Sequence, residues 1–216
     1  INPNFLYSDY TYSSGNSAGL VKHFKEYADN IIERYKPKKK SLVVDIGSND
    51  GTLLSFFKKH GLNVLGVDPA KEIAKKASSN GIKTLPKFMN LTLSKDIRKK
   101  FGLADIVTAN NAFAHGDDLI GLLKSIKNIM KPNGIFVFEV SYLLDVIEKI
   151  LLGTIFHEHH SYHSLKPLIK FMSSNNMEII DVERVSIQGG SLIGTAQIIG
   201  GPHKISPSVK KLISLE

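Results

Sequence analysis

The stretch from Ser41 to Leu54 constrains the fold of this chain more than any other. Apolar residues surround Asp45 between three lysines and a glycine turn, a pattern typical of a short strand buried on both faces. After the turn, Leu53, Leu54, Phe56 and Phe57 recur at helical spacing. A strand, a glycine loop and a helix in this order open a nucleotide-binding α/β unit.

The composition of the glycine loop limits the ligand. Gly47 and Gly51 are separated by Ser48-Asn49-Asp50, so the chain lacks the middle glycine of a dinucleotide site and the Lys-Ser or Lys-Thr of a phosphate loop. Carboxylates in this turn repel a phosphate and favour a cationic ligand. A nucleoside with a positive charge is compatible, and S-adenosylmethionine carries both a sulfonium and an amino group. A glycine-containing turn with no ligand is the alternative interpretation.

A second motif follows at Val64-Leu65-Gly66-Val67-Asp68-Pro69-Ala70. Its apolar residues predict another buried strand, which ends in an acid about 20 residues after the first glycine. At that separation a carboxylate can accept hydrogen bonds from both hydroxyls of a ribose. Pro69 and Ala70 predict the start of a helix, because proline is tolerated at early helical positions. Asp68 alone could merely cap that helix; together with the first loop it predicts a nucleoside site.

The bulk composition is that of one α/β domain. The chain has 216 residues, of which 42% are hydrophobic and 22% charged. No apolar run approaches the roughly 18 residues of a membrane span, and no signal-peptide layout is present. The absence of cysteine excludes disulfides and thiol catalysis and is compatible with the cytoplasm, the location that we predict.

The formal net charge of +8 indicates anionic partners. Most lysines occur as scattered pairs, which favours solvated faces over a nucleic-acid stripe; the diphosphate of a sugar nucleotide would be attracted equally well. We predict a small-molecule substrate, with neither nucleic acid nor a membrane as partner. The oligomeric state is left open.

Alternating element signals predict the rest of the fold. The expected helices are at about 17–35, after the loop from Leu53, from 69–70, within 88–100, and at 119–130, 142–151 and 165–174. The expected strands are at 41–46, 64–68, 81–85, 104–111, 135–140, 177–187 and 191–199, the last two forming a hairpin around Gln188-Gly189-Gly190. This order predicts a doubly wound, mostly parallel seven-stranded sheet of the Rossmann-like type, with one antiparallel strand.

We divide the chain at two positions. Residues 1–40 are expected to be a leader loop and helix, a possible lid; 41–200 a core that binds S-adenosylmethionine; and 201–216 the start of a truncated C-terminal region. Within the core, Asp45, Asp68, Asn110 and Glu139 end four buried strands. Ligands of such sheets bind at the carboxyl ends of the strands, so these residues are expected to share one edge.

Four of the eight histidines fall within residues 157–163. A metal site is one interpretation, although Ser161 stands where the second histidine of the zinc-protease pattern belongs. A structural loop is another. General acid–base chemistry is the third, and we favour it, because histidine exchanges a proton near neutral pH.

Several motifs together resemble one family. They are Val44-Asp45-Ile46-Gly47-Ser48-Asn49-Asp50-Gly51, Val67-Asp68-Pro69, Asn110-Asn111-Ala112-Phe113-Ala114-His115, Phe156-His157-Glu158-His159 and Gly189-Gly190-Ser191-Leu192. Over residues 5–199 the chain is similar to the sugar C-methyltransferases, which use S-adenosylmethionine to methylate a carbon beside the ketone of a nucleotide-linked deoxysugar. The first two motifs occur in methyltransferases at large; the Asn-Asn and His-Glu-His motifs are more specific.

The resemblance implies a set of site residues. The residues that would surround the sugar are Tyr12, His115, Glu158 and His159, with His159 as the base and no metal required. The predicted contacts to S-adenosylmethionine, which leaves as S-adenosylhomocysteine, are Asp45, Gly47, Ser48, Asn49, Gly51, Asp68, Pro69, Phe88, Asn110 and Asn111.

Three features depart from the family pattern. Phe156 stands where tyrosine is usual, and Ile193 where arginine is frequent. The family also has a cysteine-rich zinc module before this domain and another domain after it, so the sequence is expected to be part of a longer protein.

The alternatives are an O- or N-methyltransferase of another small molecule, a non-catalytic nucleoside-binding domain, and an oxidoreductase using a nicotinamide. Methylation of nucleic-acid amino groups is disfavoured, because Asn110-Asn111-Ala112-Phe113 lacks the prolines of Asn-Pro-Pro-Tyr. The sequence leaves open the sugar, its nucleotide and the methylated atom.

Overall fold

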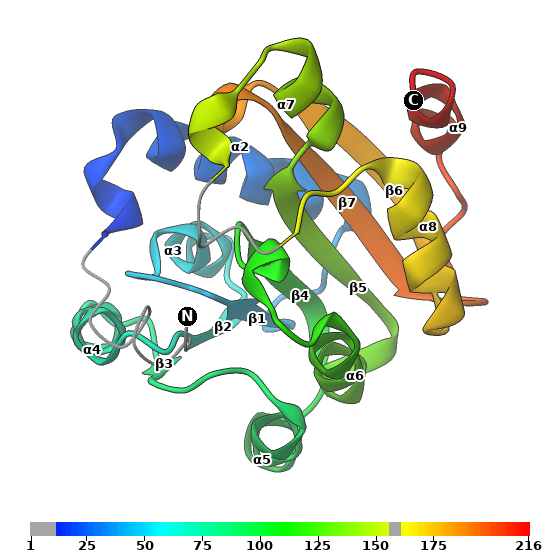
Figure 1. Ribbon diagram of the computed structural model, residues 1–216. Helices are drawn as coiled ribbons and strands as arrows, with labels where there is room; N and C mark the ends of the chain where they lie inside the picture. The colour runs from blue at the N-terminus through cyan, green and yellow to red at the C-terminus, as the bar shows by residue number, and fades with distance from the viewer. Residues whose placement is uncertain (1–11, 156–160) are drawn as a thin grey trace. The chain divides into compact units, whose positions relative to one another are not determined.

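The computed structural model describes residues 12–155 and 161–216. Its strands form one seven-stranded sheet in the order β3-β2-β1-β4-β5-β7-β6 (Figure 1). β7 is antiparallel to both of its neighbours, whereas the pairings of β1 with β2 and β4 and of β2 with β3 are parallel. The predicted fold class, a mostly parallel sheet with one antiparallel strand, is confirmed.

The chain divides into two compact units, of which the first comprises residues 1–89 and 103–108. Its strands and helices, in chain order, are α2 (Ala18–Tyr35), β1 (Leu42–Ile46), α3 (Thr52–Lys59), β2 (Asn63–Val67), α4 (Lys71–Ser79), β3 (Thr84–Leu85) and most of β4 (Ala104–Asn110). α3 packs against β1, β2 and α2, and α4 packs against β3. Leu20, Phe24 and Ile31 recur at helical spacing and form the buried stripe of α2, the helix predicted at 17–35.

The second unit comprises residues 90–102 and 109–216. Its elements are α5 (Leu91–Phe101), the end of β4, α6 (Leu119–Ile129), β5 (Met130–Ser141), α7 (Leu143–Glu148), α8 (Leu165–Ser174), β6 (Met177–Val185), β7 (Ser191–Ile198) and α9 (Pro207–Ile213). Short 3-10 helices lie at η2 (Phe113–His115), η3 (Leu152–Thr154) and η4 (Ile187–Gly189). α8 and α9 lie along β6, as Figure 1 shows.

Most predicted elements are confirmed; the limits of three of them differ clearly, and one helix was not predicted. β3 has only two residues, and α7 ends at Glu148 rather than near Leu151. β5 begins at Met130, so the residues expected to form a turn at 131–134 extend the strand instead. α9 was not expected; burial of Val209 and Leu212 holds it on the second unit.

The core is apolar within each unit. In the second unit it includes a group of aromatic rings in which Phe113 contacts Phe136, Phe138 and Phe171 at centroid distances of 5.6–6.3 Å. Among the described residues, none of the helices is both long and apolar enough to cross a bilayer.

Candidate functional site

The glycine loop between β1 and α3 has the conformation that a ligand-binding turn requires. Gly47 and Gly51 have φ angles of 72° and 78°, a region in which only glycine is free of strain. The N–H groups of Gly47 and Ser48 donate to the Val67 carbonyl, which joins the loop to the end of β2. The loop is therefore held at the carboxyl ends of β1 and β2.

Asp45 is a buried acid at the base of this loop. On β1 it lies beside Gly66 of β2 and Thr108 of β4, and the Thr108 hydroxyl donates to it at 2.6 Å. Its side chain is 3% exposed, and burial raises its pKa to about 7, with a smaller contribution from the charge of Asp68. A cationic group that reaches this carboxylate would stabilise its charged form.

Asp68 is held by the backbone in a way that leaves it able to accept further bonds. Its two carboxylate oxygens accept from Asn49 N at 2.8 Å and from Ala70 N at 2.9 Å. Burial raises its pKa, while the two backbone bonds act in the opposite direction. Each oxygen keeps a lone pair, so the group can receive the two hydroxyls of a ribose.

Ser48 provides a test of whether the loop fits a ligand. Its side chain is 4% exposed, and the buried hydroxyl has no hydrogen-bond partner among the described residues. A side chain on Gly66 would place its Cβ 2.4 Å from this hydroxyl, so the glycine in β2 makes room for it. A buried hydroxyl without a partner costs about 1–3 kcal/mol, which a polar ligand would offset. The loop therefore fits an adenosyl amino acid, which is polar and cationic.

The remaining predicted contacts in the first unit lie in loops. Pro69 directly follows Asp68, and Phe88, which is 37% exposed, follows β3. Tyr12 is about half exposed, and its carbonyl accepts from the Asn49 side-chain amide at 2.9 Å. The structure thus brings Tyr12 to the loop that contains Gly47 and Ser48, although the two are far apart in sequence.

In the second unit, Asn110 ends β4 with a buried amide. Neither its nitrogen nor its oxygen has a hydrogen-bond partner within the described part of the chain. Asn111 has a φ of 50°, and its N–H donates to the Glu139 carbonyl at the end of β5. His115 closes η2 two residues after the fully buried Phe113, which anchors that turn in the core.

The predicted base and its neighbours, His157, Glu158 and His159, lie outside the described residues. Directly after them, Ser161 and His163 contact each other at 2.9 Å, and the Ser161 hydroxyl also donates to the Ala114 carbonyl beside His115. Burial lowers the pKa of His163. The segment that follows the His-Glu-His stretch is therefore fixed to η2.

Comparison with known proteins identifies the family of this chain. A family described as "Methyltransferase domain" matches residues 21–182, three quarters of the chain. The chain belongs to the methyltransferase-domain family.

Two groups of curated relatives match the methyltransferase domain. C-methyltransferase NovU of Streptomyces niveus is 32% identical over 216 residues, which is all of this chain and 51% of the relative. A ubiquinone biosynthesis O-methyltransferase of Vibrio parahaemolyticus is 26% identical over 149 residues, 62% of this chain and 63% of the relative. The chain thus spans about half the length of NovU.

Solved structures share the fold of the methyltransferase domain. Magnesium protoporphyrin IX methyltransferase of Synechocystis with bound SAH has a TM-score of 0.62 at 16% identity, covering 89% of this chain and 90% of that one. The PH0226 protein of Pyrococcus horikoshii has a TM-score of 0.63 at 16% identity, covering 87% and 95%.

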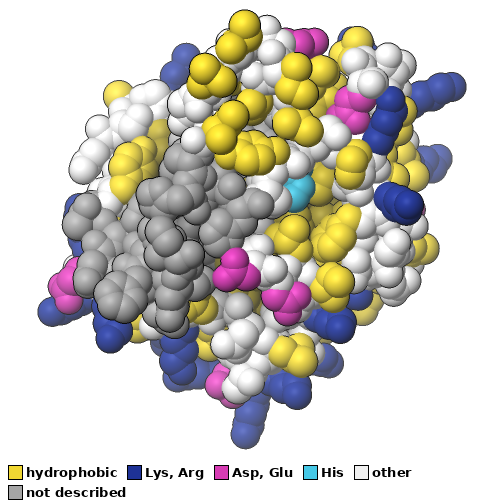
Figure 2. All heavy atoms as spheres, viewed as in Figure 1, with side chains coloured by type: hydrophobic (Ala, Val, Ile, Leu, Met, Phe, Trp, Pro, Cys, Tyr) yellow, Lys and Arg dark blue, Asp and Glu magenta, His cyan; other side chains and the backbone are white. Residues whose placement is uncertain are grey.

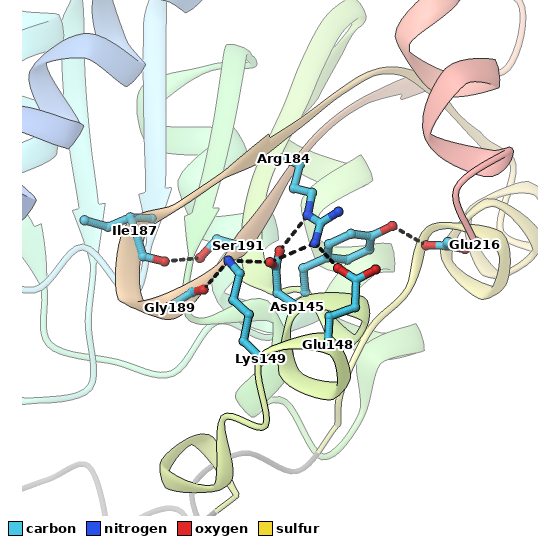
Figure 3. A network of polar contacts seen from close by, with 9 residues as sticks. Asp145, Glu148, Lys149, Arg184, Ile187, Gly189, Ser191 and Glu216 are labelled. Carbon is cyan, nitrogen blue, oxygen red and sulfur yellow. Dashed lines mark hydrogen bonds and ion pairs between the residues drawn. The ribbon is translucent and has the colours of Figure 1, made fainter.

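The sequence did not indicate the charged cluster between α7 and β6 (Figure 3). Arg184 donates to both oxygens of the buried Asp145 at 2.9 Å and also to Glu148, and Lys149 donates to the Gly189 carbonyl at 2.7 Å. Burial raises the pKa of Asp145, but the bonds from Arg184 and Lys149 outweigh it and hold the pKa below its usual range. The cluster joins α7 to the Gly189-Gly190 turn that the family motif includes. Asp145 and Arg184 are nearly 40 residues apart in the sequence, so no local pattern indicates that they form an ion pair.

α7 and the segment that follows it up to Ile155 carry an apolar surface. Ile147, Ile150, Leu152 and Ile155 are each more than 60% exposed. Hydrophobic side chains gather over the α7 region at the top of Figure 2.

Proposed function

We propose that this methyltransferase domain transfers the methyl group of S-adenosylmethionine to a carbon beside the ketone of a nucleotide-linked keto-deoxysugar. The observation that carries the proposal is the 32% identity to a C-methyltransferase along all 216 residues. The family motifs of the sequence, including the His-Glu-His stretch at 157–159, support the same acceptor.

The acidic loop of the first unit would hold the cofactor. Asp68 has the geometry to accept the ribose hydroxyls, and the buried Asp45 favours a cation. The Ser48 hydroxyl, which has no hydrogen-bond partner in residues 12–155 and 161–216, can bond to a polar group of the ligand. Gly47, Asn49 and Gly51 would shape this loop through their backbone. Pro69 would contact the cofactor beside Asp68, and Phe88 would lie against the adenine ring. Asn110 and Asn111 complete the proposed cofactor contacts.

The acceptor chemistry requires a base. S-adenosylmethionine supplies an electrophilic methyl group when bound. His159, as a neutral imidazole, would remove the proton from the carbon beside the ketone, and Glu158 would orient the imidazole or bind a sugar hydroxyl. His115 or Tyr12 would donate a hydrogen bond to the oxygen on which charge develops.

An O-methyltransferase of another small molecule is the second candidate. The matches to ubiquinone biosynthesis O-methyltransferases favour it, although they cover 62–74% of the chain rather than all of it. Mass spectrometry and NMR of the product separate the two, because the new methyl group would be on carbon or on oxygen. A methyl group on oxygen would overturn the proposal.

Proton exchange tests the base separately from methyl transfer. With S-adenosylhomocysteine bound and a keto-sugar nucleotide in deuterated water, the chain should exchange the proton of the carbon beside the ketone. His159→Asn should slow this exchange at least about 100-fold, the usual contribution of a positioned base. His60→Asn, on the exposed end of α3, is the control and should exchange like the parent. Unchanged exchange in His159→Asn would exclude this residue as the base.

A further inference from the structure

Residues Tyr12–Asn16, here called the strap, contact the cofactor loop through a compact set of hydrogen bonds. The Asn49 side chain accepts from Ser14 N and donates to the Tyr12 carbonyl, both at 2.9 Å. One oxygen of Asp50 accepts from the Ser13 hydroxyl and, at 2.9 Å, from Gly15 N. In these four bonds the partners on the loop side are two adjacent residues between Gly47 and Gly51.

The fit of the strap to the loop is close as well as polar. A Cβ on Gly15 would lie 3.0 Å from both Asp50 Oδ2 and Thr52 Oγ1, so this position accepts no side chain without displacement. Lys76 of α4 also approaches the Ser13 hydroxyl, at 3.4 Å. Ser13 and Ser14 are buried as a result.

Asp50 is suited to hold the strap as an ionised group. Its second oxygen accepts from the backbone and hydroxyl of Thr52, at 3.1 and 2.6 Å. Partial burial raises its pKa, but the bonds from Ser13, Thr52 and Gly15 outweigh it and keep the pKa below its usual value. Hydrogen bonds to a charged acceptor are stronger than bonds between neutral groups, so an ionised Asp50 holds the strap more firmly than a neutral one would.

Asn49 connects the strap to the proposed ribose site. Its side chain contacts Tyr12 and Ser14, while its own N–H donates to Asp68 Oδ2 at 2.8 Å. Asn49 adopts a φ of 49°, so the strap contacts and the bond to Asp68 depend on one unusual backbone conformation. A change in either set of contacts acts on the other through this residue.

We propose that Asn49 and Asp50 are positioning residues that hold the strap on the cofactor loop, so that strap docking and adenosyl binding strengthen each other. The inference rests on the proposed role of Asp68 as the ribose acceptor. Because coupling between two equilibria is reciprocal, a docked strap raises the affinity for the cofactor by the same factor by which the cofactor favours docking. Tyr12, at the end of the strap, is then held in this position more strongly when the cofactor site is filled.

The test measures S-adenosylhomocysteine affinity by calorimetry in variants of the strap, which leave the loop itself intact. Gly15→Ala should raise the dissociation constant about 10-fold, within the usual range of coupling between sites. Ser13→Ala, which removes one hydrogen bond to Asp50, should also raise the dissociation constant. Gly19→Ala, at an exposed position of α2 with no atom within 4 Å of the new Cβ, is the matched control and should bind like the parent.

Hydrogen exchange gives an independent readout. Saturating S-adenosylhomocysteine should slow exchange of the Ser14 and Gly15 amides, whose bonds are to Asn49 and Asp50, by up to the same factor of about 10. If both strap variants bind S-adenosylhomocysteine like the parent and amide exchange is unchanged, the inference is overturned. A loss of binding in Asp68→Ala would then still support the proposed ribose site. Parent-like affinity in Asp68→Ala would overturn the proposed cofactor site, and the inference with it.

Discussion

At the scale of single residues, Asp45 is a buried acid whose pKa the fold raises far above its usual value. Its burial and the nearby charge of Asp68 raise its pKa to about 7, and Thr108 holds it in one orientation. The sequence predicted both acids as ligands, because each ends a buried strand. The pKa of Asp45 could not be predicted, because it depends on β2 and β4 enclosing the side chain on both sides.

The raised pKa of Asp45 predicts pH-dependent cofactor binding. A cationic group of the ligand favours the ionised carboxylate, which is the minor form below pH 7. Affinity for S-adenosylhomocysteine should therefore rise by up to about 10-fold between pH 6 and 8. Where Asp45 is protonated in the free protein, binding should release that proton to the buffer. Calorimetry in buffers of different ionisation enthalpy measures that proton. In Asp45→Asn the affinity should be low at every pH and the proton release lost; a retained pH profile would contradict the assignment.

The raised pKa of Asp45 also predicts how the free energy of unfolding depends on pH. This free energy should fall as pH rises, whereas the affinity for the cofactor should increase. Its folded pKa of about 7 lies above the unfolded value of 3.8, so the folded state binds the proton more tightly. The unfolding free energy should decline as pH rises from about 4 to 7, because ionisation then favours the unfolded chain. Asp45→Asn removes this decline and should be more stable than the parent at pH 8 by on the order of 2–4 kcal/mol, measured by urea unfolding. Equal stability at pH 8 would show that Asp45 ionises freely in the fold.

At the scale of elements, α7 and the β6–β7 turn are held together by charge rather than by apolar packing alone. A side chain on Gly190 would place its Cβ 2.3 Å from Asp145 Cγ, so the turn lies directly on the buried carboxylate. Arg184 neutralises that carboxylate from β6, and Tyr142, which precedes α7, donates to Glu216 at 2.8 Å (Figure 3). The Gly189-Gly190 turn of the family motif thus lies on a carboxylate of α7 that a residue of β6 neutralises.

Removing Arg184 should therefore leave the buried Asp145 with Lys149 as its remaining cationic partner. We expect Arg184→Met to lower the unfolding free energy by about 3 kcal/mol, because a buried charge loses its bidentate partner. Arg98→Met, on the exposed face of α5, is the control and should lie within about 0.5 kcal/mol of the parent in urea unfolding. If the unfolding free energy of Arg184→Met falls no further than that of Arg98→Met, Arg184 does not stabilise the buried Asp145.

The elements show how far the sequence could predict this fold. Buried strands such as β1 and β4 and amphipathic α2 carry a local pattern, and their types were correct to within a few residues. α9 has only seven residues and is stabilised by β6 and α8, so its short sequence carried too little signal. The bonds of the strap to Asn49 and Asp50 join positions about 35 residues apart, and no pattern within either segment indicates them.

At the scale of the whole molecule, the formal net charge of +8 has a consequence for the acceptor. A positive protein attracts a nucleotide diphosphate over distances of about 10 Å at 0.1 M salt, and much less at 1 M. S-adenosylhomocysteine is a zwitterion without net charge, so the same field acts on it far less. The two ligands therefore test the proposed substrate class without any substitution.

For a nucleotide-linked sugar, KM should rise several-fold between 0.05 and 0.5 M sodium chloride, because screening weakens the attraction of its diphosphate. The dissociation constant of S-adenosylhomocysteine, measured over the same range, should change by less than about 2-fold. The corresponding free keto-sugar, which has no phosphate, is the matched control and should show no salt dependence. A nucleotide sugar whose KM is as insensitive to salt as that of the free sugar would indicate that the diphosphate is not bound by the positive field of this chain.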